Sequence, residues 1–150
     1  MQSLRSHERL AIDMLLAGEH EALARLRTQA SQVSVSKRTY SAAGEYVDLT
    51  VPDGLELAEP NNLILQDVEF TFEDVKDGAA ILLYVEGGRL SFIEFATYGV
   101  EWPEEPKVLE VHYLREVQTQ PGTYFYEPTP LRDQRTLDRA LLGRQRASAA

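Results

Sequence analysis

The chain lacks several residue types and patterns, and each absence excludes a class of function. It contains no cysteine, which rules out a structural disulfide, a thiolate zinc site and a cysteine nucleophile. Its longest apolar runs, such as AAILLYV, fall far short of the roughly 20 residues that a membrane-spanning helix needs. The N-terminal segment is polar and carries Glu8 and Asp13, so we expect no signal peptide. We therefore expect a cytoplasmic protein that does not bind membranes.

Basic side chains are scarce in the middle of the chain. Residues 41–128 hold four basic and 18 acidic side chains, a balance of −14, whereas residues 1–40 and 129–150 carry +2 and +3. Phosphate binding needs clustered lysine and arginine, so we expect no binding to nucleic acid. Two interpretations of the acids stay open. They form either a solvated sheet face that keeps the protein soluble or a surface that binds a basic protein partner.

Motifs for catalysis and cofactor binding are also missing. The chain has no Walker phosphate loop and no dinucleotide fingerprint. His7, His20 and His112 stand alone, without the spacing of a metal-binding motif, so a metal site would need distant residues to converge. Ser91 lies within a strand-like segment and not in a nucleophile elbow. We expect no cofactor, no metal, and surface or packing roles for the three histidines.

The hydrophobic periodicity predicts a single α+β domain over residues 1–150. Apolar residues recur at helical spacing over residues 1–31, which predicts a helical hairpin with one apolar face. From residue 33 the period changes to two, and residues 33–128 predict a mainly antiparallel sheet of five to seven strands.

The C-terminal segment TPLRDQRTLDRALLG predicts a helix over residues 129–143. Thr129 is the expected N-cap, and Pro130 suits the first helical position because its missing N–H has no partner there anyway. Residues 144–150 are expected to form a frayed tail.

Gly87 and Gly88 separate two strongly apolar segments, AAILLYVE and RLSFIEFATY. The glycine pair suits a two-residue hairpin turn, which would place Glu86 opposite Arg89 and Ile81 opposite Glu94. Both faces of this hairpin are largely apolar. Such strands are typical of a central position in a sheet that is covered on both sides.

Glu94 is the acid with the most unusual surroundings. On this register it shares a face with apolar side chains, namely those of Ile81, Leu83, Leu90, Phe92 and Ala96. An ionised carboxylate there is costly without a partner. We expect a structural ion pair with an arginine of the C-terminal helix. The alternatives are a strand-edge carboxylate that reaches solvent and a catalytic acid or base with a raised pKa.

The loop that follows this hairpin combines aromatic and acidic residues. Tyr98 and Trp102 bracket Gly99, with Glu101, Glu104 and Glu105 beside them. The indole is either a plug over the end of the core or an anchor for a partner. Acids beside aromatic rings suit an arginine or lysine of that partner. The predicted partner-binding residues are Tyr98, Glu101, Trp102, Glu104 and Glu105. A second aromatic segment, GTYFYEP, predicts an edge strand.

Three segments together resemble a family of small bacterial proteins of unassigned function. They are LLAGEHEALARLRTQ, RTYSAAGEYVDLTVP and GGRLSFIEFATYGVEWP. The family carries an LLxGxHxxLAxLRxQ helix, a turn and strand that end in Val-Pro, and a GxLxxxExxTYGxxWP segment. The resemblance implies a bacterial cytoplasmic protein with an α+β fold, and it implies no catalytic residues.

Three hypotheses for the function follow. The leading one is a non-enzymatic protein-binding module that uses its acidic aromatic surface against a basic protein partner. Immunity proteins, which neutralise secreted toxins, are similar at the level of architecture alone, and fold does not establish function. The second is a small-molecule binder or hydrolase-type enzyme that uses Glu94. The third is a homodimer that pairs through an edge strand.

Overall fold

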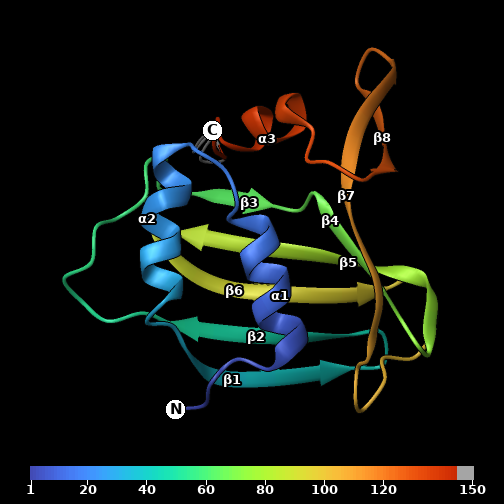
Figure 1. The fold of residues 1–150 in the computed structure, drawn as a ribbon, viewed down its shortest axis with the longest axis horizontal. Helices are drawn as coiled ribbons and strands as arrows, with labels where there is room; N and C mark the ends of the chain where they lie inside the picture. Colours follow the sequence, from blue (N-terminus) through green and yellow to red (C-terminus); the bar gives the residue numbers. More distant parts are fainter. Residues whose placement is uncertain (145–150) are drawn as a thin grey trace, which may run out of the picture.

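The computed structural model describes residues 1–144, which form three helices and one eight-stranded antiparallel sheet (Figure 1). The helices are α1 (Ser6–Leu15), α2 (Glu21–Ala30) and α3 (Gln134–Ala140). The strands are β1 (Ser34–Ser41), β2 (Gly44–Thr50), β3 (Leu63–Leu65), β4 (Val68–Phe72), β5 (Val75–Glu86), β6 (Arg89–Thr97), β7 (Val108–Gln120) and β8 (Thr123–Thr129). Seven strands run in the order β1-β2-β6-β5-β4-β7-β8, and β3 pairs with β5. The predicted α+β class is confirmed, with one strand more than expected.

The two N-terminal helices form because their apolar residues recur on one face. In α1 the buried face includes Ile12 and Leu15, and in α2 it includes Leu23 and Leu26. The imidazole Nδ1 of His20 caps α2 by accepting a hydrogen bond from the backbone N–H of Ala22 at 3.0 Å. Both helices lie across the same face of the sheet (Figure 1). The predicted helical hairpin is therefore confirmed.

The C-terminal helix begins later than its sequence suggests. Thr129 pairs with Tyr113 as the last residue of β8, so it is not available as a cap. Asp133 is the N-cap instead, and its carboxylate accepts a hydrogen bond from the backbone N–H of Thr136 at 3.1 Å. The predicted cap at Thr129 is wrong because strand pairing continues through that residue. Most of the predicted frayed tail lies outside the described residues.

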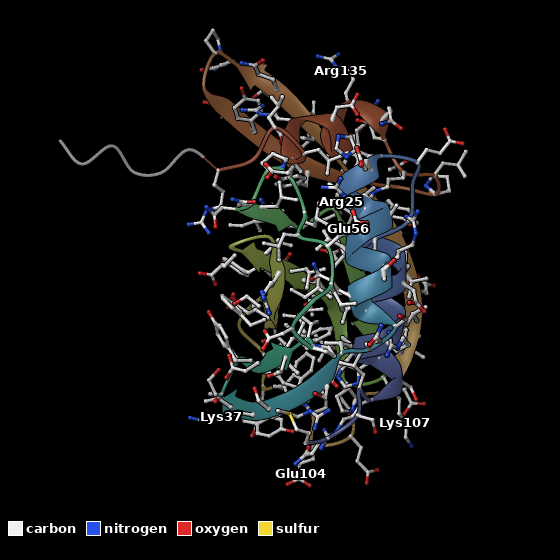
Figure 2. All side chains as sticks on the ribbon, turned by 90° about the vertical axis from the view of Figure 1, so that its left-hand side faces the viewer. Arg25, Lys37, Glu56, Glu104, Lys107 and Arg135 are labelled. Atoms are coloured by element: carbon white, nitrogen blue, oxygen red, sulfur yellow. The ribbon has the colours of Figure 1, made fainter. Side chains whose placement is uncertain are left out.

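Helices α1 and α2 cover one face of the sheet. On the other face, no helix within residues 1–144 covers the central strands. In the view of Figure 2, α1 and α2 both lie on one side of the sheet. Along β5 the side chains of Ile81 and Leu83 are buried, whereas those of Leu82 and Tyr84 are half-buried. The expectation of cover on both sides is therefore wrong. We call the second surface the open face, and its central side chains are Tyr46, Asp48, Ile64, Glu69, Ala80, Leu82, Tyr84, Glu86, Phe92, Glu94 and Ala96.

The β5–β6 hairpin has the predicted turn and its central position, but its register changes partway. Glu86 lies opposite Arg89 as expected, and the register then shifts so that Ser91 has no partner. This extra residue is a β-bulge, and it moves every later side chain of β6 to the other face. Glu94 consequently lies opposite Leu82, not Ile81.

The two glycines of the turn provide a matched pair for a stability test. Both have positive φ angles, +60° at Gly87 and +80° at Gly88. A Cβ at Gly87 would meet no atom within 4 Å, but one at Gly88 would lie 2.7 Å from the Cβ of Leu57. We expect Gly87→Ala to lower the free energy of unfolding by about 1 kcal/mol. Gly88→Ala adds a clash, and we expect a loss of roughly 3 kcal/mol.

Urea denaturation of the two variants measures this difference. Equal losses would contradict the packing of Gly88 against the segment that carries Leu57.

Candidate functional site

Five polar or aromatic side chains converge under the loop that follows β6, and we call them the buried polar cluster. They are His7 and Glu8 from the first turn of α1, Arg38 from β1, Glu45 from β2, and Trp102 from the loop. His7, Glu8 and Glu45 are 4%, 0% and 1% exposed. Burial of so many ionisable groups is expensive unless they pair, so their contacts decide what the cluster does.

Glu8 and Arg38 form a two-pronged ion pair. The guanidinium donates to the two Glu8 oxygens at 2.7 and 2.9 Å, and the backbone N–H of Arg5 donates to Oε1 at 2.8 Å. Burial alone would raise the pKa of Glu8, but these hydrogen bonds outweigh it and lower the pKa to about 2. Glu8 is therefore an ionised, firmly held carboxylate.

Glu45 is less well satisfied than Glu8. The indole Nε1 of Trp102 donates to its Oε2 at 3.3 Å. Its other oxygen, Oε1, lies 3.5 Å from Nε2 of His7. Among the described residues neither of these two buried atoms has a hydrogen-bond partner. Such unpaired polar atoms are uncommon in protein interiors and call for an explanation.

Trp102 encloses the cluster from the loop side. Its ring lies 5.3 Å from that of Phe72 and 5.6 Å from that of Phe95, between ring centroids. Its backbone N–H donates to the carbonyl of Ala42 at 2.9 Å, which fixes the loop on the β1–β2 turn. Only 7% of the side chain is exposed. This enclosed position is that of a plug, so we leave Trp102 out of the binding surface proposed below.

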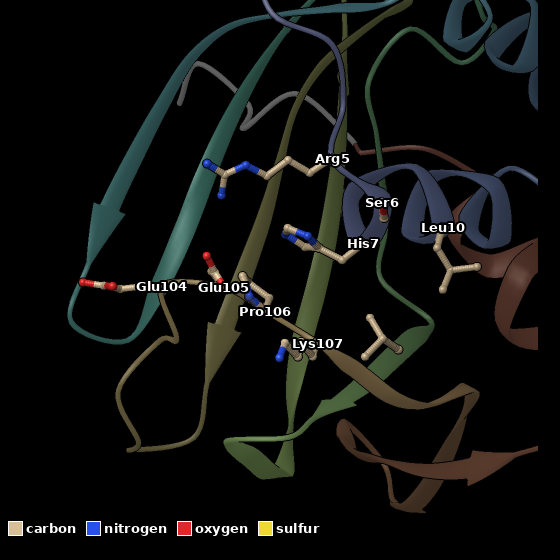
Figure 3. A pocket seen from close by; sticks show the side chains of 9 residues that line it. Arg5, Ser6, His7, Leu10, Glu104, Glu105, Pro106 and Lys107 are labelled. Atoms are coloured by element: carbon tan, nitrogen blue, oxygen red, sulfur yellow. The ribbon is translucent and has the colours of Figure 1, made fainter.

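The other predicted partner-binding residues divide between two places. Glu104 and Glu105 line a cleft of about 750 Å³ next to His7 (Figure 3). The complete lining is Arg5, Ser6, His7, Leu10, Glu104, Glu105, Pro106, Lys107 and Val108. Glu101 is exposed in the same loop. Tyr98 is 55% exposed, and its hydroxyl donates to Oε2 of Glu69 at 3.1 Å on the open face.

Glu94 lies on the open face and makes no ion pair within residues 1–144. Its neighbour across the strands is Tyr46, and the hydrogen bond to Glu94 is the main cause that raises the pKa of the Tyr46 hydroxyl. The expected pair with a C-terminal arginine is wrong, because the bulge turns Glu94 away from the helices. Arg132 and Arg139 pair instead with Asp67 and Glu116.

Three aromatic rings form a continuous stack at the centre of the open face. The ring of Phe92 lies 4.1 Å from that of Tyr84 and 5.5 Å from that of Tyr46, and both pairs are stacked. The guanidinium of Arg144 lies 6.0 Å from the centroid of the Tyr84 ring. These rings shield one another in part, which explains how an aromatic sheet face persists without a covering helix.

The ring stack and the convergence of His7 with Glu45 were both missed by sequence reasoning. The stack had a readable signal, because Tyr84 alternates with buried aliphatic residues along β5 and Tyr46 lies between the buried residues Glu45 and Val47. The meeting of His7 and Glu45 had none, since no sequence spacing links a helix start to a residue on β2.

Comparison of the chain with family models, curated proteins and solved structures finds no match. The resemblance described above therefore stays a prediction. None of the described helices is long and apolar enough to cross a membrane.

Proposed function

We propose that this protein is a non-enzymatic binding module that docks a basic segment of a partner protein on its open face. The observation that carries the proposal is the stack of three rings, those of Tyr46, Phe92 and Tyr84. The stack lies on the open face, whose central strands no helix within residues 1–144 covers (Figure 2). Contiguous exposed apolar surface of this kind marks interaction sites in soluble proteins. Aromatic residues also supply much of the binding energy at protein interfaces.

The charges around the stack favour a basic partner. Four carboxylates stand on the strands that carry or adjoin the rings, those of Asp48, Glu69, Glu86 and Glu94. Apart from Arg144, whose guanidinium lies over the Tyr84 ring, the cations Lys37 and Arg89 lie at the margins: Lys37 is opposite Asp48, and Arg89 is ion-paired with Asp53. The guanidinium of Arg144 lies 6.0 Å from the centroid of the Tyr84 ring, which is a cation–π contact. An arginine of a partner can make the same kind of contact with these rings.

The biological setting belongs to the same proposal. An immunity protein that neutralises a basic toxin is one module of this kind, in the bacterial cytoplasm that the family resemblance implies. The enzyme alternative with Glu94 is less favoured, because Glu94 lies on a strand face beside Tyr46 and Leu82. Catalytic carboxylates belong in clefts with converging polar groups.

Charge reversal at two glutamates separates the open face from the loop surface. Glu94→Lys changes the open face, and Glu104→Lys makes the same change of net charge at the exposed loop. The partner is first identified by affinity capture from the source cells and then produced as a pure protein. Calorimetric titration at low and high salt measures its affinity for each variant.

We expect a basic partner whose affinity falls as salt rises. Glu94→Lys and Tyr84→Ala should each weaken binding on the order of tenfold or more, whereas Glu104→Lys leaves it unchanged. The reverse result would assign binding to the loop residues Glu101, Glu104 and Glu105. A complex made only of two copies of this chain, measured by light scattering, would replace the proposal with the homodimer.

A further inference from the structure

The unpaired atoms of His7 and Glu45 point to a ligand that the protein interior is built to hold. Both side chains are more than nine-tenths buried, and their free atoms, Nε2 and Oε1, face each other at 3.5 Å. An unpaired imidazole nitrogen and an unpaired carboxylate oxygen are two of the ligand types that zinc takes from proteins.

The distance between these two atoms suits a shared metal ion. Zinc binds imidazole nitrogen and carboxylate oxygen at about 2.0–2.2 Å, so two ligands of a tetrahedral site lie about 3.4 Å apart. The observed 3.5 Å matches this spacing. It is long for a hydrogen bond between nitrogen and oxygen.

The carboxylate of Glu8 supplies a third ligand group at the same place. The ligand atoms of His7, Glu8 and Glu45 all lie within 4.8 Å of one another. Oε1 of Glu8 already accepts two hydrogen bonds, from Arg38 and from the backbone N–H of Arg5, whereas Oε2 of Glu8 accepts one from Arg38. Oε2 therefore keeps a lone pair that can face an ion.

The charges of the cluster favour a cation. The carboxylates of Glu8 and Glu45 each bring an oxygen within 4.8 Å of the other, and Arg38 neutralises one of the two charges. Two carboxylates this close inside a protein need a proton or a cation to hold them together. His7 also lines the cleft of about 750 Å³, so the cluster lies directly beside that cleft (Figure 3).

We propose that His7, Glu45 and Glu8 form a binding site for one Zn²⁺ ion, with a fourth position open toward the cleft. A nitrogen ligand with two carboxylates suits zinc better than calcium or magnesium, which prefer oxygen ligands alone. The site lies on the helix-covered side of the sheet, and its existence does not depend on the binding function proposed for the open face. The proposal reverses the expectation from the isolated histidines that the chain binds no metal.

The single tryptophan makes the site observable in the unmodified protein. Trp102 is the only tryptophan in the chain, and its Nε1 contacts Glu45. Co²⁺ occupies tetrahedral zinc sites, quenches nearby indole fluorescence and shows visible absorption that reports its coordination. Chelator-treated full-length protein is titrated with Co²⁺ and then with Zn²⁺, and calorimetry gives the stoichiometry.

We expect one ion per chain, quenching of Trp102 by Co²⁺, and recovery of the fluorescence on addition of Zn²⁺ or chelator. The melting temperature should rise with Zn²⁺ concentration, because an ion that binds only the folded state stabilises it. The isosteric variant Glu45→Gln and the variant His7→Gln should weaken Zn²⁺ binding at least about tenfold. Circular dichroism establishes that each variant is folded.

A second histidine–glutamate pair serves as the matched control. Nε2 of His112 lies 3.0 Å from Oε1 of Glu69 on the open face, where the two side chains are 20% and 18% exposed. His112→Gln should leave Zn²⁺ affinity and Co²⁺ quenching unchanged. Absence of Zn²⁺ binding in the unmodified protein would show that a proton alone bridges the cluster. Binding that is lost in His112→Gln but kept in His7→Gln would equally overturn the proposal. If neither cluster variant folds, the quenching and its reversal in the unmodified protein decide the question.

Discussion

Replacing Trp102 with alanine is expected to lower the free energy of unfolding by about 4 kcal/mol, the range for removing a large buried aromatic side chain. The indole packs on Phe72 and Phe95 and closes the core at the end of the sheet. Its loss also leaves Oε2 of Glu45 without its donor inside the protein. A buried acceptor that loses its partner adds its own penalty.

Urea denaturation followed by far-ultraviolet circular dichroism measures the effect, since the variant has no tryptophan to follow. Tyr98→Ala is the matched control, because Tyr98 belongs to the same loop and is 55% exposed. Its loss should stay within about 1 kcal/mol. Similar small losses for both variants would mean that the indole is not part of the core in solution.

Patterns that depend on neighbouring residues predicted the fold well. The Gly87–Gly88 pair between two strongly apolar segments was enough to predict the central hairpin, because the turn and its two strands are specified by adjacent residues. The two N-terminal helices followed from apolar spacing in the same way. These elements are specified locally, so a single sequence contains their signal.

The errors in the predicted strand register and helix start arose where a single residue sets the position of many others. Ser91 is an inserted residue in β6, and nothing in the composition of that strand distinguishes it from a paired one. That bulge reversed the predicted face of Glu94 and therefore its predicted partner. The start of α3 was misplaced for a related reason, since Thr129 suits a helix cap and a strand end equally well.

The candidate sites depend even more on contacts between residues that are distant in the sequence. The loop residues with an aromatic and acidic composition were found from sequence, but burial of Trp102 depends on contacts with strands far away in the chain. The buried polar cluster joins the start of α1 to β1 and β2. Such convergence is a property of the packed helix and sheet, so no spacing rule reveals it.

The cluster also makes the stability of the protein depend on Arg38. We expect Arg38→Met to lower the free energy of unfolding by about 3–5 kcal/mol at pH 7, because it leaves the buried carboxylate of Glu8 without its guanidinium. Methionine retains much of the apolar stem of arginine, so the loss reports mainly on charge and hydrogen bonding. Arg135→Met, at an exposed arginine of α3, should change stability by less than about 1 kcal/mol.

Acid provides the sharper test of this ion pair. The folded-state pKa of Glu8 is about 2, below its usual 4.5. The ionised Glu8 therefore contributes fully to the free energy of unfolding above pH 4.5, and this contribution is lost as the pH falls toward 2. The shift corresponds to about 3 kcal/mol in the unmodified protein. In Arg38→Met, the guanidinium that lowers the pKa of Glu8 is gone, and burial favours the protonated carboxyl. The variant therefore does not lose this stability in acid. The difference in unfolding free energy between the two proteins should therefore narrow between pH 4.5 and 2, measured by urea denaturation with chelator present so that no bound ion contributes. Parallel stability curves across that range would show that Arg38 does not hold Glu8 in its ionised form.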